Sequence, residues 1–105
     1  MNKFTINLTP EFENELDTIY FELLFTNHNI VSAKHFFYKV RKSILDLSIF
    51  PERYSRLSNY EKSLELNIIK LLLENYLIIY RVDNQTNQVF VLHIFHCSQN
   101  YLEKI

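Results

Sequence analysis

The chain has 105 residues, of which 48% are hydrophobic and 22% are charged, and its formal net charge at pH 7 is −1. This length and balance predict one globular domain spanning 1–105, large enough to bury a modest core. No apolar run approaches the ~18 residues that cross a bilayer, so we expect no membrane partner. Because the chain has no glycine, it cannot contain a glycine-rich phosphate loop or a dinucleotide fingerprint.

The residues that bind metals and cofactors are sparse. The lone cysteine, Cys97, cannot form an internal disulfide and stands in no metal-binding spacing. His93 and His96 are three residues apart, which places them on opposite faces of a strand and argues against a shared metal ion. Residues 1–7 lack the apolar stretch of a secretion signal. We therefore expect a cytoplasmic chain that holds no metal ion and no small-molecule cofactor.

The N-terminal third predicts a short strand followed by a helix. Residues 4–8 alternate apolar and polar side chains, as a half-buried strand does. Thr9 and Pro10 then combine a good helix N-cap with a proline in the first turn. Apolar residues at helical spacing predict that the helix ends near Phe25; they are Phe12, Leu16, Ile19, Tyr20, Leu23 and Leu24.

A second helix is expected after a loop at 26–29, with Ser32 as its N-cap. Apolar side chains repeat on one face up to Leu47, and Pro51 stops the helix because the residue before proline disfavours helical geometry. The short loop predicts that the two helices form an antiparallel hairpin. The first helix is acidic, whereas the second carries four cations: Lys34, Lys39, Arg41 and Lys42.

The last third predicts three strands. Residues 53–63 are polar and are expected to be irregular. The leucines and glutamates of 64–74 favour a helix, but this segment precedes a hairpin, so we prefer a strand over 66–73. Two β-rich runs, 76–82 and 89–96, bracket the polar turn 84–88 and predict that hairpin. Asparagines stand at the expected breaks in place of glycine, because asparagine tolerates the left-handed backbone region.

The predicted element order is β-α-α-β-β-β. It implies an α+β fold in which an N-terminal strand and an antiparallel two-helix hairpin precede a three-strand antiparallel meander. The helices should cover one sheet face, since their apolar stripes need a partner. The other face should stay partly open and expose an apolar surface for a partner.

Four stretches, in this order, resemble motifs of the RelE/ParE superfamily of bacterial toxins from type II toxin–antitoxin systems. They are the strand-to-helix transition at 8–11, the phenylalanine–proline stop at 50–54, the strand at 75–82 and the C-terminal run at 96–101. The resemblance implies a growth-inhibiting toxin, of a kind linked to plasmid stabilisation, that a cognate antitoxin neutralises. RelE-like members cleave mRNA in the ribosome, whereas ParE-like members inhibit DNA gyrase without being nucleases.

The chain departs from RelE-like nucleases where those proteins use cations. An arginine, a lysine and a C-terminal basic pair are replaced by Leu77, Ile68, Ser98 and Gln99. Since cations stabilise the phosphate transition state of such a nuclease, the resemblance favours a ParE-like toxin that acts by protein-surface contact, with gyrase as its target. The alternatives are a ribosome-dependent mRNA endoribonuclease, with the ribosome and mRNA as partners, and an attenuated relative that only binds antitoxin.

Candidate residues follow from these hypotheses. For a nuclease, the catalytic candidates are Lys70, Arg81, His96 and Tyr101. The candidates for binding a target or a phosphate are Arg53, Arg56 and Arg81. On the basic face of the second helix, the candidates for binding an acidic antitoxin segment are Lys34, Arg41 and Lys42.

Each candidate also has a purely structural alternative. Arg81 is expected to pair with a carboxylate such as Glu65 or Glu74, because an unpaired charge sealed in a sheet is costly. His96 is then an ordinary histidine at a strand end, and the segment after Pro51 is a solvated loop. The basic helix face is then merely solvated.

Overall fold

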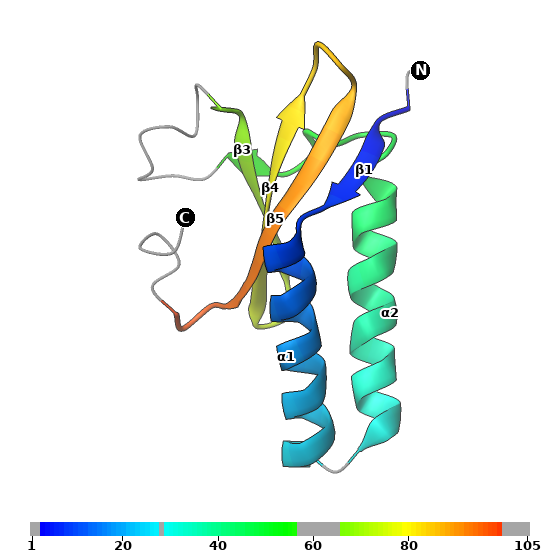
Figure 1. The fold of residues 1–105 in the computed structure, drawn as a ribbon, viewed down its shortest axis with the longest axis vertical. Coiled ribbons are helices and arrows are strands. Elements are labelled where there is room, and N and C mark those ends of the chain that lie inside the picture. The colour runs from blue at the N-terminus through cyan, green and yellow to red at the C-terminus, as the bar shows by residue number, and fades with distance from the viewer. Residues whose placement is uncertain (1–2, 28, 57–65, 100–105) are drawn as a thin grey trace.

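The computed structural model describes residues 3–27, 29–56 and 66–99. These residues form a two-layer α+β fold in which two helices lie against one face of a five-stranded sheet (Figure 1). The predicted order of strand, helix pair and antiparallel meander is confirmed. The elements are β1 (Thr5–Leu8), α1 (Pro10–Asn27), α2 (Ile30–Asp46), β2 (Ser55–Arg56), β3 (Ile68–Leu73), β4 (Tyr76–Asp83) and β5 (Gln88–His96).

The sheet has the strand order β1-β5-β4-β3-β2, so the first strand of the chain lies beside the last. β3, β4 and β5 are antiparallel neighbours, as the hairpin pattern predicts. β1 pairs parallel with β5, from Thr5 opposite Gln88 to Leu8 opposite Val91 (Figure 1). Because this pairing stops at Leu8, α1 begins beside the part of β5 that extends past its strand partner.

β2 lies in a segment that was predicted to be irregular. It pairs antiparallel with β3, with Ser55 opposite Lys70 and Arg56 opposite Ile69. A strand of two residues has no periodicity for sequence analysis to detect, since an alternating pattern needs about four residues.

Thr9 starts α1, as predicted. Its hydroxyl oxygen accepts a hydrogen bond from the amide of Phe12 at 3.2 Å, and its carbonyl accepts one from the amide of Glu13 at 3.1 Å. The same hydroxyl lies 3.0 Å from the carbonyl oxygens of Val91 and Leu92, to which it donates. The N-cap residue therefore also fixes the start of the helix against β5.

α2 begins earlier than predicted, and the expected role of Ser32 as its N-cap is wrong. The N-cap is Asn29, whose side-chain oxygen accepts hydrogen bonds from the amides of Val31 and Ser32. Asparagine and serine are comparably good caps, so sequence alone does not choose between them. The helix ends at Asp46, ahead of Pro51 as expected.

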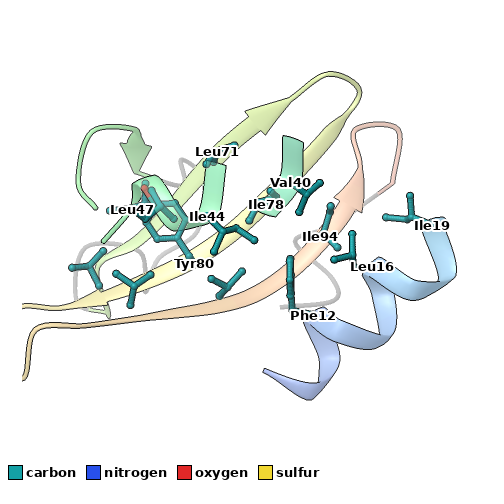
Figure 2. Packing of buried hydrophobic residues seen from close by; sticks show 14 of the residues in the cluster. Phe12, Leu16, Ile19, Val40, Ile44, Leu47, Leu71, Ile78, Tyr80 and Ile94 are labelled. Atoms are coloured by element: carbon teal, nitrogen blue, oxygen red, sulfur yellow. The ribbon is translucent and has the colours of Figure 1, made fainter. Parts of the chain in front are cut away.

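The main core lies between the helix pair and the sheet (Figure 2). Phe12 of α1 and Val40 of α2 are fully buried against alternate side chains of the central strands. Tyr80 of β4 is also fully buried, and its hydroxyl donates to the carbonyl oxygen of Pro51. A buried tyrosine needs such an acceptor, and this bond ties β4 to the segment that follows α2.

The opposite sheet face is not the open apolar surface that we predicted. Ile68, Leu77, Ile79 and Phe95 form a second cluster there, and none of them is more than 6% exposed. Alternation correctly predicts which side chains point to this face. It does not predict their exposure, because exposure depends on what packs beside them.

Within the described residues, three that are not glycine adopt a left-handed backbone: Asn67, Glu74 and Asn87, with φ of 54°, 56° and 54°. Two are asparagines, as expected for a chain without glycine. Glu74 lies in the tight turn between β3 and β4, and its carboxylate is 2.8 Å from the ammonium group of Lys39 on α2. Neither described helix is long and apolar enough to cross a membrane.

Candidate functional site

A groove runs along the helix pair. It consists of three hollows with shared lining residues, of about 520, 430 and 530 Å³. Phe37 of α2 lines all three, and the buried side chains of Phe12 and Leu16 form part of the first. Apolar side chains that line the same surface remain exposed; they are Leu8, Phe21, Tyr38 and Leu45. We call this surface the helix-pair groove.

Charged side chains of opposite sign line the two sides of the helix-pair groove. Lys34, Arg41 and Lys42 of α2 lie along one side, and Glu13 and Asp17 of α1 along the other. Among the described residues, none of these five side chains is in an ion pair or a hydrogen bond. The structure thus brings together the three predicted antitoxin-binding residues, and it places two acidic residues opposite them.

Arg81 lies on the sheet face away from the helices, where it is half-buried. Its guanidinium carbon is 4.7 Å from the centre of the Phe90 ring on β5, which is a cation–π contact. The expected pairing with Glu74 is wrong, because that carboxylate binds Lys39 instead. Glu65 lies outside the described residues. An aromatic ring on the neighbouring strand therefore supports the arginine.

The nuclease candidates are not gathered at one place. Lys70 and Arg81 are diagonal neighbours on the face away from the helices. His96 lies on the helix side at the other end of the sheet, opposite Tyr76. Tyr76 precedes Arg81 on β4 by a distance of roughly 17 Å, at ~3.4 Å per residue. Tyr101 lies outside the described residues.

His96 lines a hollow of about 430 Å³ between α1 and the end of the sheet. Its Nδ1 accepts the Ser98 amide at 3.1 Å and lies 2.7 Å from the Ser98 hydroxyl oxygen. A nitrogen lone pair used in this way is not free to accept a substrate proton. Burial, reinforced by the charges of Glu22 and Glu74, raises the pKa of neighbouring Tyr76. This neighbourhood supports the structural alternative for His96.

The two loop arginines differ in how freely they are presented. Arg53 donates from Nη2 to the Asp46 carbonyl and from Nε to the Phe50 carbonyl, both at 2.9 Å. The bond to Asp46 satisfies a carbonyl group at the end of α2, where cations are favoured. Arg56 is exposed, with a nitrogen 3.8 Å from the Glu52 carboxylate. Of the two, Arg56 is the one available to an external anion.

One important polar residue was missed by sequence analysis. The Glu15 carboxylate on α1 accepts the Ile94 amide at 3.2 Å and lies 3.2 Å from Nδ1 of His93. This contact occurs beside a β-bulge, where the register of β4 with β5 shifts between Ile79 and Tyr80. Bulges re-aim side chains. The sequence carries no signal of the bulge, and sequence analysis gave Glu15 no role beyond the acidic character of the first helix.

No group of three or more histidine, cysteine, aspartate or glutamate side chains is arranged to hold a metal ion in the part of the chain that the structure describes.

Comparison with known proteins agrees with this fold. A family model described as the ParE toxin of the type II toxin–antitoxin system parDE matches residues 6–101. The class of protein is thus the toxins of type II toxin–antitoxin systems. The chain belongs to the ParE toxin family, within the RelE/ParE superfamily. None of the curated proteins matches it.

Two solved structures share the fold at low sequence identity. The chromosomal ParDE toxin–antitoxin system from P. aeruginosa is similar with a TM-score of 0.72 and 16% identity, over 90% of this chain and 96% of that one. The toxin–antitoxin complex RelBE2 from Mycobacterium tuberculosis is similar with a TM-score of 0.62 and 19% identity, over 94% and 97%. At these identities the likeness extends to the fold alone.

Proposed function

We propose that this chain is a ParE-like toxin that inhibits its target by protein-surface contact and that a cognate antitoxin neutralises it. The observation that carries the proposal is the helix-pair groove. Lys34, Arg41 and Lys42 lie there beside the exposed side chains of Tyr38 and Leu45. An apolar groove with a basic border suits an amphipathic segment with acidic residues along one side.

The solved relatives support an antitoxin partner. Both are described as toxin–antitoxin systems or complexes. We transfer that kind of partner to this chain as part of the proposal, with the helix-pair groove as its docking surface.

DNA gyrase is the proposed target, because the three nuclease candidates within the described residues do not come together in one centre. Lys70 and Arg81 lie on the face opposite to that of His96. Leu77, at a position where the nucleases use an arginine, is buried in the second cluster. Removal of one charge-stabilising group typically costs on the order of a hundredfold in rate. A target blocked by surface contact requires no such centre.

The alternative function is ribosome-dependent mRNA cleavage, and one arrangement favours it. Lys70 and Arg81 are close on one sheet face, with the Phe90 ring beside the arginine. Cations next to an aromatic ring are a common way to hold a nucleotide, through its phosphate and its base. An attenuated relative that retains only antitoxin binding is the third hypothesis.

The groove is tested by antitoxin affinity. Isothermal titration of the antitoxin should show binding at least about tenfold weaker for Arg41→Glu than for wild type, because like charges would then face each other. Lys3→Glu, an equal charge reversal at an exposed position away from the groove, is the matched control. Equal affinities for wild type, Arg41→Glu and the control would exclude the helix-pair groove as the docking surface.

A further inference from the structure

We infer that, in the absence of antitoxin, two copies of this chain pair through their helix-pair grooves, with α1 of one copy on α2 of the other. The partner is a second copy because the surface is complementary to itself in both apolarity and charge. Two exposed stripes border the groove, one on each helix.

Each helix presents a stripe that combines charge with exposed apolar area. On α1 the stripe runs through Glu13, Asp17, Phe21 and Phe25 at four-residue intervals, and the two phenylalanine rings are stacked, with 55% and 71% of their surface exposed. Residues four apart lie on the same helix face. Exposed aromatic area of this kind usually marks an interaction site.

The stripe on α2 matches it with the opposite charge. It runs through Lys34, Tyr38, Arg41 and Leu45, in which Tyr38 is 62% and Leu45 is 59% exposed. The stripe on α1 of one copy and the stripe on α2 of another can therefore make both apolar contacts and contacts between opposite charges. One copy leaves both stripes uncovered among its described residues.

The acidic and basic groups also lie at the same level along the hairpin. Asp17 lines one hollow together with Arg41 and the next together with Lys34. Rotation about a two-fold axis parallel to the helices leaves the height of each residue along the helices unchanged. Residues at the same height on α1 and α2 therefore meet across such a dimer. Such an axis places Asp17 of each copy opposite Arg41 and Lys34 of the other.

The charge pattern selects this symmetry over its competitor. With the two-fold axis perpendicular to the helices, α1 would face α1, and acidic residues would oppose acidic residues. With the axis parallel to them, both acid–base contacts form twice in one closed, isologous interface. Like-charge contacts across an interface are costly, so the parallel axis is favoured.

The dimer and the antitoxin would use the same surface and exclude each other. This consequence rests on the proposed function, whereas the dimer itself does not. The free toxin would then be a dimer. Antitoxin binding would dissociate that dimer, and the groove of each toxin copy would hold an antitoxin segment in place of the second copy.

Sedimentation equilibrium of the free chain tests the dimer through charge complementation. Asp17→Arg and Arg41→Glu should each weaken self-association at least about tenfold, because each places like charges together twice. An equimolar mixture of the two variants should associate more strongly than either variant alone, since positions 17 and 41 carry opposite charges at both contacts between unlike copies. Glu11→Arg and Lys3→Glu, equal reversals at exposed positions outside the groove lining, should sediment as wild type.

The outcomes are distinct. The inference would be overturned if the wild-type chain remained monomeric at concentrations on the order of 100 μM, because a dissociation constant above that value is too weak for a specific interface. A dimer that neither variant weakens would also overturn it, as would variants that stay monomeric when mixed although circular dichroism shows both folded. Antitoxin titration of the same samples separates this result from the proposed function, because a monomer that binds antitoxin refutes only the dimer.

Discussion

Glu15 and His93 are 78 positions apart in sequence, yet the carboxylate of the first lies 3.2 Å from the imidazole Nδ1 of the second. The same carboxylate accepts the amide of Ile94 at 3.2 Å. β1 pairs with β5 only as far as Val91. Glu15 therefore provides the acceptor that the strand edge needs after β1 has ended, and it attaches α1 to the bulged part of β5.

Replacing Glu15 with alanine should destabilise the fold by about 1–3 kcal/mol, because the half-buried Ile94 amide loses its acceptor. Urea unfolding at neutral pH measures this change. Gln85→Ala, in the exposed turn between β4 and β5, is the control and should stay within about 0.5 kcal/mol of wild type. Equal midpoints for the two variants would show that the Glu15 contact carries no net stability.

Tyr80→Phe should cost about 1 kcal/mol at neutral pH, since the Pro51 carbonyl loses its hydrogen-bond donor. Tyr38→Phe is the matched control, because that ring is 62% exposed. Chemical denaturation of both variants measures the difference. If Tyr80→Phe is as stable as Tyr38→Phe, the bond between β4 and the segment after α2 contributes nothing.

The same residue predicts a pH dependence. Burial raises the pKa of Tyr80 above its ordinary value of 10.0, so in alkali the unfolded chain loses this proton before the folded chain does. Stability should be constant with respect to this group below pH 10 and fall as the pH rises above it. Tyr80→Phe should reduce that fall, and Tyr76, whose pKa is also raised, should account for part of what remains. An unchanged alkaline slope in Tyr80→Phe would contradict this assignment.

Arg81 and Phe90 should be coupled. A double-mutant cycle with Arg81→Met and Phe90→Leu should yield a coupling free energy of about 0.5–1 kcal/mol for a partly exposed cation–π contact. Urea unfolding of the four proteins gives the value. A coupling indistinguishable from zero would mean that the 4.7 Å approach of the guanidinium to the ring is incidental.

Local signals predicted most of the fold, because the physics behind them acts over a few residues. Thr9 and Pro10 favour a helix start through local backbone geometry, and the hairpin of β4 and β5 follows from two β-rich runs around a turn. The parallel pairing of β1 with β5 was not predictable. It depends on how the helix hairpin returns the chain to the sheet, which no local pattern encodes.

The site was predicted in part for the same reason. Helical spacing alone puts Lys34 and Arg41 on one face of α2. The acidic side opposite them, with Asp17, depends on how α1 packs beside α2. Glu74 was predicted incorrectly as a partner of Arg81, and the contact with Phe90 was not foreseen, because cross-strand register decides that Phe90 lies next to the arginine. Glu15 was missed because a bulge re-aims the residue that it contacts.

We propose that this ParE family member acts on gyrase by surface contact and not as a nuclease. The most direct test is supercoiling of relaxed plasmid by purified gyrase, titrated with the chain. We predict that supercoiling falls as the chain is added and recovers when antitoxin is added. Undiminished supercoiling, together with codon-specific cleavage of translated mRNA that Lys70→Ala and Arg81→Ala abolish, would contradict the account and establish the endoribonuclease alternative.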